Sequence, residues 1–260
     1  MELLTSQDVF WVFPIDEQLK AEVRQLSRDL HLNKNTLDTS AQRKHLVHAL
    51  NAIIDTGFEF YYDKPASDED RLSPMVRGTV NSIIKTVRGA IHLVVQRVFK
   101  NIPRNDLKLL AYYLDSMILT SPVQSGQSYL AFPLALSIRE DLHRVMEKVD
   151  QSDAIDRYGE DLAAVLNDII TSSTHYYYHF PTEFVALKGF VKKAADIGID
   201  STVKGIQKIV RRVLKDIDHD DVALMFGNLE RLVLTMDVPH KVCVAEYPIH
   251  KTGEADITNT

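Results

Sequence analysis

The chain has 260 residues, a formal net charge of −6 at pH 7, 45% hydrophobic residues and 25% charged residues. This composition is typical of a globular protein with a proper core, and the negative charge argues against a molecule built as a whole to bind polyanions. The 10 glycines are too few for a turn-rich all-β fold, and a single cysteine, Cys243, excludes an intramolecular disulfide and fits a reducing compartment. The chain shows neither a secretory signal nor an apolar run of about 18 residues, so we expect a cytoplasmic protein without a membrane span.

The first half of the chain predicts an extended segment followed by helices. Residues 8–13 are β-branched and aromatic and end at Pro14, which suits the first turn of a helix that reaches about Leu30. Aliphatic side chains at spacings of three and four then predict more helices. These span residues 40–62, 74–102 and 104–119.

The second half repeats this order. Residues 129–132 look extended, and Pro133 opens the next helix. After a polar loop, the periodicity predicts a long helix that ends in Tyr176-Tyr177-Tyr178, and Gly198 is expected to break a later helix. The remaining helices are expected over 181–197, 206–217 and 221–234, before an extended segment over 240–249 and a polar tail.

Matching residues recur between the halves at a nearly constant interval. Phe13-Pro14 returns 119 residues later as Phe132-Pro133, and Tyr61-Tyr62 returns 116 residues later as Tyr177-Tyr178. The interval changes only at expected loops or helix breaks, where insertions are tolerated. At an interval of 115 the matches include Val95 with Val210, Arg97 with Arg212, Val98 with Val213, Lys100 with Lys215, and Leu119-Thr120 with Leu234-Thr235.

We therefore predict an all-α fold of two tandem homologous helical bundles, related by an internal duplication with a period of about 115–119 residues. Residues 1–119 would form the first repeat, residues 120–239 the second, and residues 240–260 an extended segment with a polar tail. We expect pseudo-two-fold symmetry, with the short extended segments either pairing in a minor sheet or strapping one bundle to the next. Because Tyr247-Pro248-Ile249 resembles the opening of a third repeat, we expect residues 240–249 to be ordered.

Two matching stretches of the chain are strongly basic. Residues 76–104 hold six cations and no acid, and the matching stretch of the second half is offset only by Asp196 and Asp200. Like charges three or four residues apart on a helix cost about 0.2–0.5 kcal/mol per pair, which an anionic partner would offset. The alternative is that these are solvated helix faces balanced by acids elsewhere in the fold. The predicted contact residues are Arg88, Arg97, Lys100, Lys204, Lys208, Arg211, Arg212 and Lys215.

A metal site is a second hypothesis. His175 and His179 lie four residues apart, as metal ligands on one helix face do, and their matches in the first half are Glu59 and Asp63. If a two-fold axis passed nearby, two histidines and two carboxylates would converge, which suits Zn²⁺ or Fe²⁺. The alternative is that these are exposed or packing side chains beside tyrosines.

The aromatic cluster is a third candidate. Consecutive aromatic residues on a helix cannot all face the same way, so some must point into solvent, a cavity or a partner. Tyrosine has an apolar body and a polar tip, which suits interfaces and amphiphilic ligands, although packing between helices explains the cluster as well. The predicted ligand-lining residues are Tyr61, Tyr62, Tyr177 and Tyr178.

Three functions follow from these patterns. The leading expectation is a non-enzymatic interaction or scaffolding protein whose basic helices contact an acidic protein or another polyanion; nucleic acid, a membrane surface and a second copy of the chain are further partners. The first alternative is a carrier of an amphiphilic small molecule between the two halves. The second is a metal-dependent enzyme. No glycine-rich phosphate loop or nucleophile motif occurs, so we assign no catalytic residue and expect no cofactor other than a divalent metal.

Overall fold

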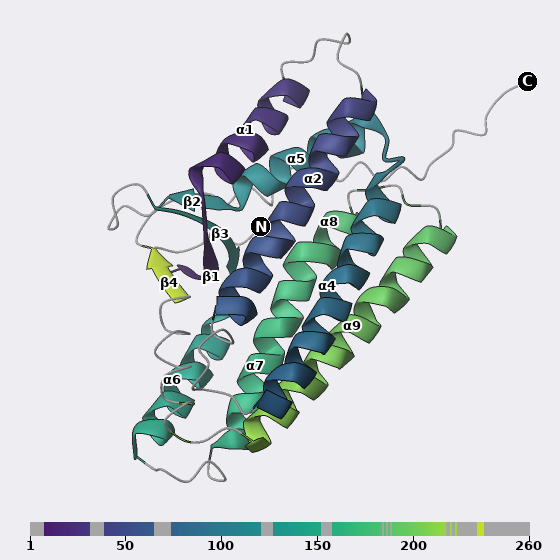
Figure 1. The fold of residues 1–260 in the computed structure, drawn as a ribbon. Coiled ribbons are helices and arrows are strands. Elements are labelled where there is room, and N and C mark those ends of the chain that lie inside the picture. Colours follow the sequence, from purple (N-terminus) through teal and green to yellow (C-terminus); the bar gives the residue numbers. More distant parts are fainter. Residues whose placement is uncertain are drawn as a thin grey trace, which may run out of the picture.

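The computed structural model describes residues 8–31, 39–64, 74–120, 127–151, 158–183, 189–216 and 233–236, together with Val185, Leu187, His219 and Val222. These residues are mostly helical and include a small sheet, which confirms the predominantly helical fold (Figure 1). In this part of the chain, no helix combines the length and hydropathy that a membrane crossing requires. The segment 240–249, which we expected to be ordered, lies outside the described residues, as does the rest of 240–260.

The helices follow the predicted order along the chain. Asp16 helps to fix the start of the first one, because its Oδ1 accepts a hydrogen bond from the Leu19 N–H at 2.7 Å. The first half contributes α1 (Glu17–His31), α2 (Thr39–Phe58), α4 (Pro74–Phe99) and α5 (Arg104–Ser116). The second half contributes α6 (Leu136–Gln151), α7 (Gly159–Thr174), α8 (Phe180–Glu183) and α9 (Gly189–Asp216).

The expected helix break at Gly198 is wrong, because α9 runs through this residue without interruption. A Cβ atom at Gly198 would lie 3.3 Å from Val94 Cγ2 on α4, which is a tight contact. Glycine therefore serves close helix packing at this position instead of ending the helix.

The sheet has four strands in the order β2-β3-β1-β4, and each neighbouring pair is antiparallel. The central strands β1 (Asp8–Ile15) and β3 (Ser128–Pro133) contain the two extended segments expected from the sequence, but the expectation that Pro14 and Pro133 open helices is wrong, because both prolines belong to the strands. The outer strands β2 (Ile118–Thr120) and β4 (Val233–Met236) fall at the ends of predicted helices, so the helical assignment of Leu119 and Leu234 is wrong. Short apolar runs do not distinguish a strand from a buried helix end, and here pairing with a distant strand decides the outcome.

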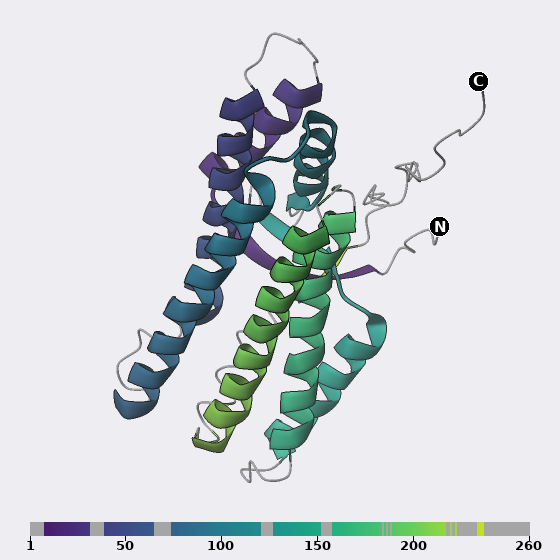
Figure 2. The ribbon, with the colours of Figure 1, turned by 90° about the vertical axis from the view of Figure 1, so that its right-hand side faces the viewer.

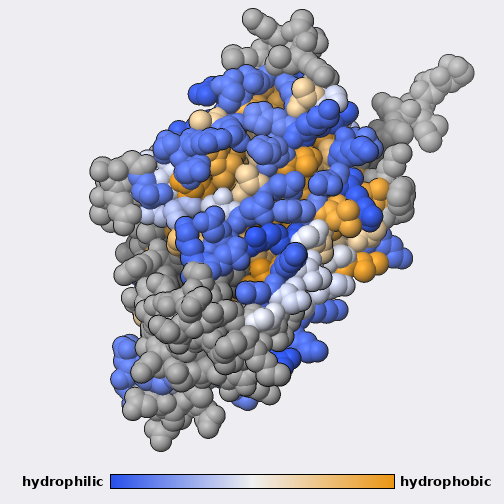
Figure 3. Space-filling model, in the orientation of Figure 1, coloured by the Kyte–Doolittle hydropathy of each residue, from blue (hydrophilic) through white to orange (hydrophobic). Residues whose placement is uncertain are grey.

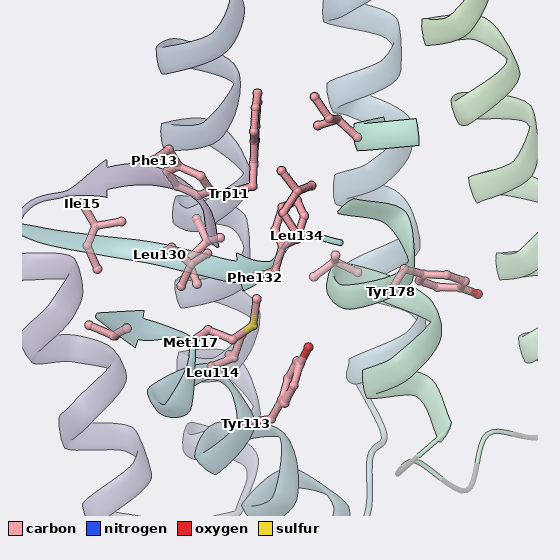
Figure 4. Packing of buried hydrophobic residues seen from close by; sticks show 14 of the residues in the cluster. Trp11, Phe13, Ile15, Tyr113, Leu114, Met117, Leu130, Phe132, Leu134 and Tyr178 are labelled. Atoms are coloured by element: carbon pink, nitrogen blue, oxygen red, sulfur yellow. The ribbon is translucent and has the colours of Figure 1, made fainter. Parts of the chain in front are cut away.

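The sheet presents one face to the helices. Trp11, Phe13 and Phe132 belong to the main core cluster, which draws on helices from both halves of the chain (Figure 4). Alternate residues of the same strands point to the opposite face, as the two-residue period of a strand requires. That face holds a smaller buried cluster of Phe10, Val12, Leu119, Tyr129 and Ala131.

Four long helices lie side by side in the order α2, α4, α9 and α7 (Figures 1 and 2). The two middle helices are antiparallel. Gly198 of α9 meets Val94 of α4, whereas Ile206 packs further down with Ile84 and Val87. Residue numbers therefore rise along α9 as they fall along α4.

Candidate ligand-binding cavity

A cavity of about 270 Å³ lies between the two halves of the chain. Its walls come from β1, α2, α4 and α5 on one side and from α7, α8 and α9 on the other, with a π-helical turn from each half, η1 (Glu59–Asp63) and η3 (His175–His179). Among the described residues that line it, none carries a charged side chain, and most are aliphatic or aromatic. The cavity can therefore recognise a ligand by its shape and by apolar contacts.

The two π turns share one sequence feature. In each turn a backbone N–H reaches five residues back, from Lys64 to the Glu59 carbonyl and from Phe180 to the His175 carbonyl. A proline follows directly in the sequence, at 65 and at 181. Because proline has no N–H, the hydrogen-bond ladder cannot continue at that residue. Turns of this kind are rare and occur frequently at functional sites.

Tyr113 supplies the hydrogen bond that Pro181 cannot. Its hydroxyl donates to the carbonyl of Tyr176 at 2.7 Å, and this carbonyl lies five residues before the proline. The contact ties α5 of the first half to η3 of the second. Burial, with a smaller effect from Tyr176, raises the pKa of Tyr113 well above its ordinary value, so the phenol remains a neutral donor.

Most hydroxyl groups around the cavity have a protein acceptor. Tyr61 donates to the Val12 carbonyl at 3.1 Å, and Tyr178 donates to Asp196 Oδ1 at 2.8 Å. Three hydroxyls donate to carbonyls four residues back on their own helices, and they belong to Ser173, Thr174 and Thr202. These groups are satisfied without a ligand, which makes the walls effectively less polar.

Tyr177 differs from its neighbours. Its ring lines the cavity, while its hydroxyl oxygen is buried and has no hydrogen-bond partner among the residues that the structure describes. Burial, with a smaller effect from Tyr113, raises the pKa of Tyr177 far above its ordinary value, so this group stays neutral. Within the described part of the chain, ring contacts hold this side chain.

Aromatic rings from both halves meet at the wall of the cavity. The ring centroid of Phe13 lies 5.7 Å from that of Tyr61 and 6.4 Å from that of Tyr177. Tyr177 in turn lies 5.4 Å from Phe132 in an edge-to-face arrangement. In Figure 4, Tyr113 and Met117 point from the end of α5 toward the strand that carries Phe132.

Three of the four tyrosines that the sequence suggested as ligand-lining do border the cavity: Tyr61, Tyr177 and Tyr178. The side chain of Tyr62 is not among those described. Sequence reasoning missed the other lining residues, such as Phe13, Met117 and Val203. Their apolar spacing is the same for a filled core as for a cavity wall, so periodicity could not have found them.

The four candidate metal ligands are engaged in other contacts. Glu59 pairs with Lys64 at 3.3 Å, and Asp63 Oδ2 accepts a hydrogen bond from Arg88 Nη2 at 2.5 Å. The rings of His175 and His179 each contact a neighbouring tyrosine ring. Across the described residues, no three His, Cys, Asp or Glu side chains are grouped so that they could hold a metal ion. The metal hypothesis remains a prediction from the sequence.

The basic residues divide into different environments. Arg88 is half-buried, with its guanidinium 5.0 Å from the ring centre of Phe58 and bonded to Asp63. The others with described side chains are exposed and form no ion pair within the described part of the chain: Arg97, Lys100, Lys204, Lys208, Arg211 and Arg212. The side chain of Lys215 is not described.

Antiparallel packing also separates these cations along the helix pair. Because Val94 lies opposite Gly198, Arg97 lies beside residue 195 or so of α9. That level is about 20 Å from Lys208 at 1.5 Å per residue. Arg97 and Lys100 therefore lie near one end of the α4–α9 pair, whereas Lys204, Lys208 and Arg211 lie toward the other. Comparisons with family models, curated proteins and solved structures found no match to this chain.

Proposed function

We propose that the protein is a carrier that binds a neutral, largely apolar small molecule in the cavity between its two halves. The observation that carries this proposal is the uncharged, apolar wall around about 270 Å³ of space. Protein interiors pack as densely as organic crystals and leave few voids larger than a water molecule. When this partly open space is empty, its apolar wall faces water, at a cost of roughly 25 cal/mol per Å² of apolar surface left uncovered. A bound ligand would offset that cost.

The volume and the wall chemistry limit the class of ligand. An engineered apolar cavity of roughly 150 Å³ binds benzene. A space nearly twice as large suits a two-ring aromatic compound or an alkyl chain of moderate length. A carboxylate or an amine buried here would lose its hydration without meeting a charged partner, so the buried part of the ligand is neutral.

We also infer that the chain arose by duplication, with residues 1–119 and 120–239 as the two units. The register of the central strand pair supports this. Val12 faces Ala131, and the two are 119 residues apart, which is the interval that relates Phe13 to Phe132. A two-fold axis through that residue pair would exchange β1 with β3.

The outer strands support the same axis independently. Phe10 of β1 faces Leu234 of β4, and Tyr129 of β3 faces Leu119 of β2. The inner residues are 119 apart and the outer ones 115 apart, which are the intervals found in the sequence. Exchanging β1 with β3 and β2 with β4 reproduces the strand order β2-β3-β1-β4. The cavity would then lie where two related units meet.

Native mass spectrometry of the purified protein tests the carrier proposal. We expect a non-covalent adduct that organic solvent extracts. Val203→Phe replaces an aliphatic side chain of the cavity wall with a bulky ring and should remove the adduct. Val191→Phe makes the same change on α9 at a half-buried position outside the cavity and should retain the adduct. A bare chain that also fails to take up added neutral naphthalene derivatives would refute the proposal.

A further inference from the structure

The outward face of α4 and α9 carries a concentration of positive charge. Residues three or four apart fall on one stripe of a helix, as Lys204, Lys208 and Arg211 do on α9 and Arg97 and Lys100 do at the end of α4. Among the described side chains of α9, the acids do little to balance them, because Asp196 pairs with Lys192, which leaves Asp200 as the other exposed acid. The exposed cations are Lys85, Arg97, Lys100, Lys193, Lys204, Lys208, Arg211 and Arg212.

Along the helix pair, two exposed aliphatic side chains lie between the cations at Arg97 and Lys193 and those at Lys204 and Lys208. Leu93 is 46% exposed and Ile197 is 58% exposed, and they are two of the three large hydrophobic residues that are exposed among the described side chains. Leu93 and Ile197 lie at the same height along the two helices, because their sequence neighbours Val94 and Gly198 are in contact. Figure 3 shows hydrophobic side chains reaching the surface among hydrophilic ones over the upper parts of these helices.

We propose that this face docks on a lipid bilayer that contains anionic lipids. Lysine and arginine are attracted to the negative surface of such a bilayer, and aliphatic side chains gain by entering the boundary between headgroups and acyl chains. A nucleic acid would use the cations but would gain nothing from Leu93 and Ile197, since phosphate contacts are polar. The combination of charge and exposed aliphatic surface therefore favours a bilayer.

The inner side of the same two helices forms a wall of the cavity. Val94 and Val95 line it from α4, and Thr202 and Val203 line it from α9. Docking would place the cavity one helix away from the bilayer, where an apolar ligand is concentrated. This link to loading rests on the proposed carrier function, whereas the docking itself does not need a ligand.

Vesicle co-sedimentation of the 260-residue chain, with no added ligand, tests the proposal. We expect binding to vesicles of phosphatidylcholine mixed with phosphatidylglycerol, weak binding to phosphatidylcholine alone, and a loss of binding as salt is raised. Lys204→Gln combined with Lys208→Gln should weaken binding about 25-fold, at roughly fivefold per cation. Leu93→Ser combined with Ile197→Ser should weaken the binding that survives at high salt.

The matched control removes the same charge elsewhere. Arg28 on α1 and Lys44 on α2 are also exposed, and changing both to Gln should leave vesicle binding unchanged. Equal losses in the control and in the Lys204/Lys208 variant, or tighter binding to a polynucleotide than to anionic vesicles, would overturn the docking proposal. If docking fails but the protein still binds ligand in vesicle-free solution, the docking proposal fails and the carrier function stands. If docking occurs but no ligand binds, the carrier function fails and the docking proposal stands.

Discussion

The two π turns occupy matching places in the two halves, yet their tyrosines are held differently. In η1, Tyr61 donates its hydroxyl to the Val12 carbonyl, and its ring packs on Trp11 and Phe13. In η3, Tyr177 follows 116 residues later and packs on Phe13 and Phe132, but its buried hydroxyl has no partner within the described residues. One turn is fixed to the sheet by a polar contact, and the other by its rings.

A different contact anchors the second turn. The hydroxyl of Tyr113 on α5 bonds to the backbone of η3 at Tyr176, next to the tyrosine that lines the cavity. The backbone of η3 is thus fixed by a hydrogen bond, while the side chain of Tyr177 packs through its ring. The same local geometry serves attachment in one half and the cavity wall in the other. If the halves are duplicates, their polar contacts have diverged more than their backbone.

The largest expected effect compares two phenylalanines at matching positions. Phe132 is fully buried and does not line the cavity, whereas Phe13 borders it. We expect Phe132→Ala to cost about 4–5 kcal/mol and Phe13→Ala about 3 kcal/mol, because removal of Phe132 opens a new void while Phe13 already faces free space. Urea denaturation of both variants checks this. Equal costs would mean that the two sites are packed alike.

The next effect concerns the attachment of η3. Tyr113→Phe leaves the Tyr176 carbonyl without its donor and should destabilise the protein by about 1–3 kcal/mol. Pro181→Ala supplies an N–H five residues after that carbonyl, so Tyr113→Phe should cost less in its presence. A double-mutant cycle measures this coupling. Additive costs would show that the proline is not the reason for the tyrosine contact.

The smallest effect separates the two turns directly. Tyr61→Phe removes a satisfied hydrogen bond and should destabilise by about 1 kcal/mol, whereas Tyr177→Phe removes an unsatisfied buried hydroxyl and should be neutral or stabilising by up to about 1 kcal/mol. Thermal unfolding of the two variants at matched concentration compares them. A loss at Tyr177 as large as at Tyr61 would contradict the difference between the turns.

The sequence predicted the helices well because each has an apolar stripe at helical spacing, as on α4. It failed where distant partners decide the structure. Leu119 and Leu234 are in strands because each pairs with another strand, and these pairings form only when the chain folds. Gly198 was expected to end a helix from its propensity alone, but its contact with Val94 is what the position requires.

The cavity was only partly predictable for a related reason. A run of consecutive tyrosines indicated this part of each half, and three of them, Tyr61, Tyr177 and Tyr178, border the cavity. The prolines at 65 and 181, spaced by the same 116 residues as the tyrosines, were a signal for the wide turns that went unused. A lining residue such as Val203 has the same sequence pattern as a core residue, and no local pattern distinguishes an unfilled space from a packed one.

The most direct test of the central claim is a fluorescence titration with N-phenyl-1-naphthylamine, a neutral dye whose emission rises in apolar surroundings. We predict saturable binding at a single site in the wild-type protein, weakened about tenfold or more by Val203→Phe and unchanged by Val191→Phe. Unsaturable binding, or equal affinity in the wild type and the Val203→Phe variant, would contradict a ligand site between the two halves.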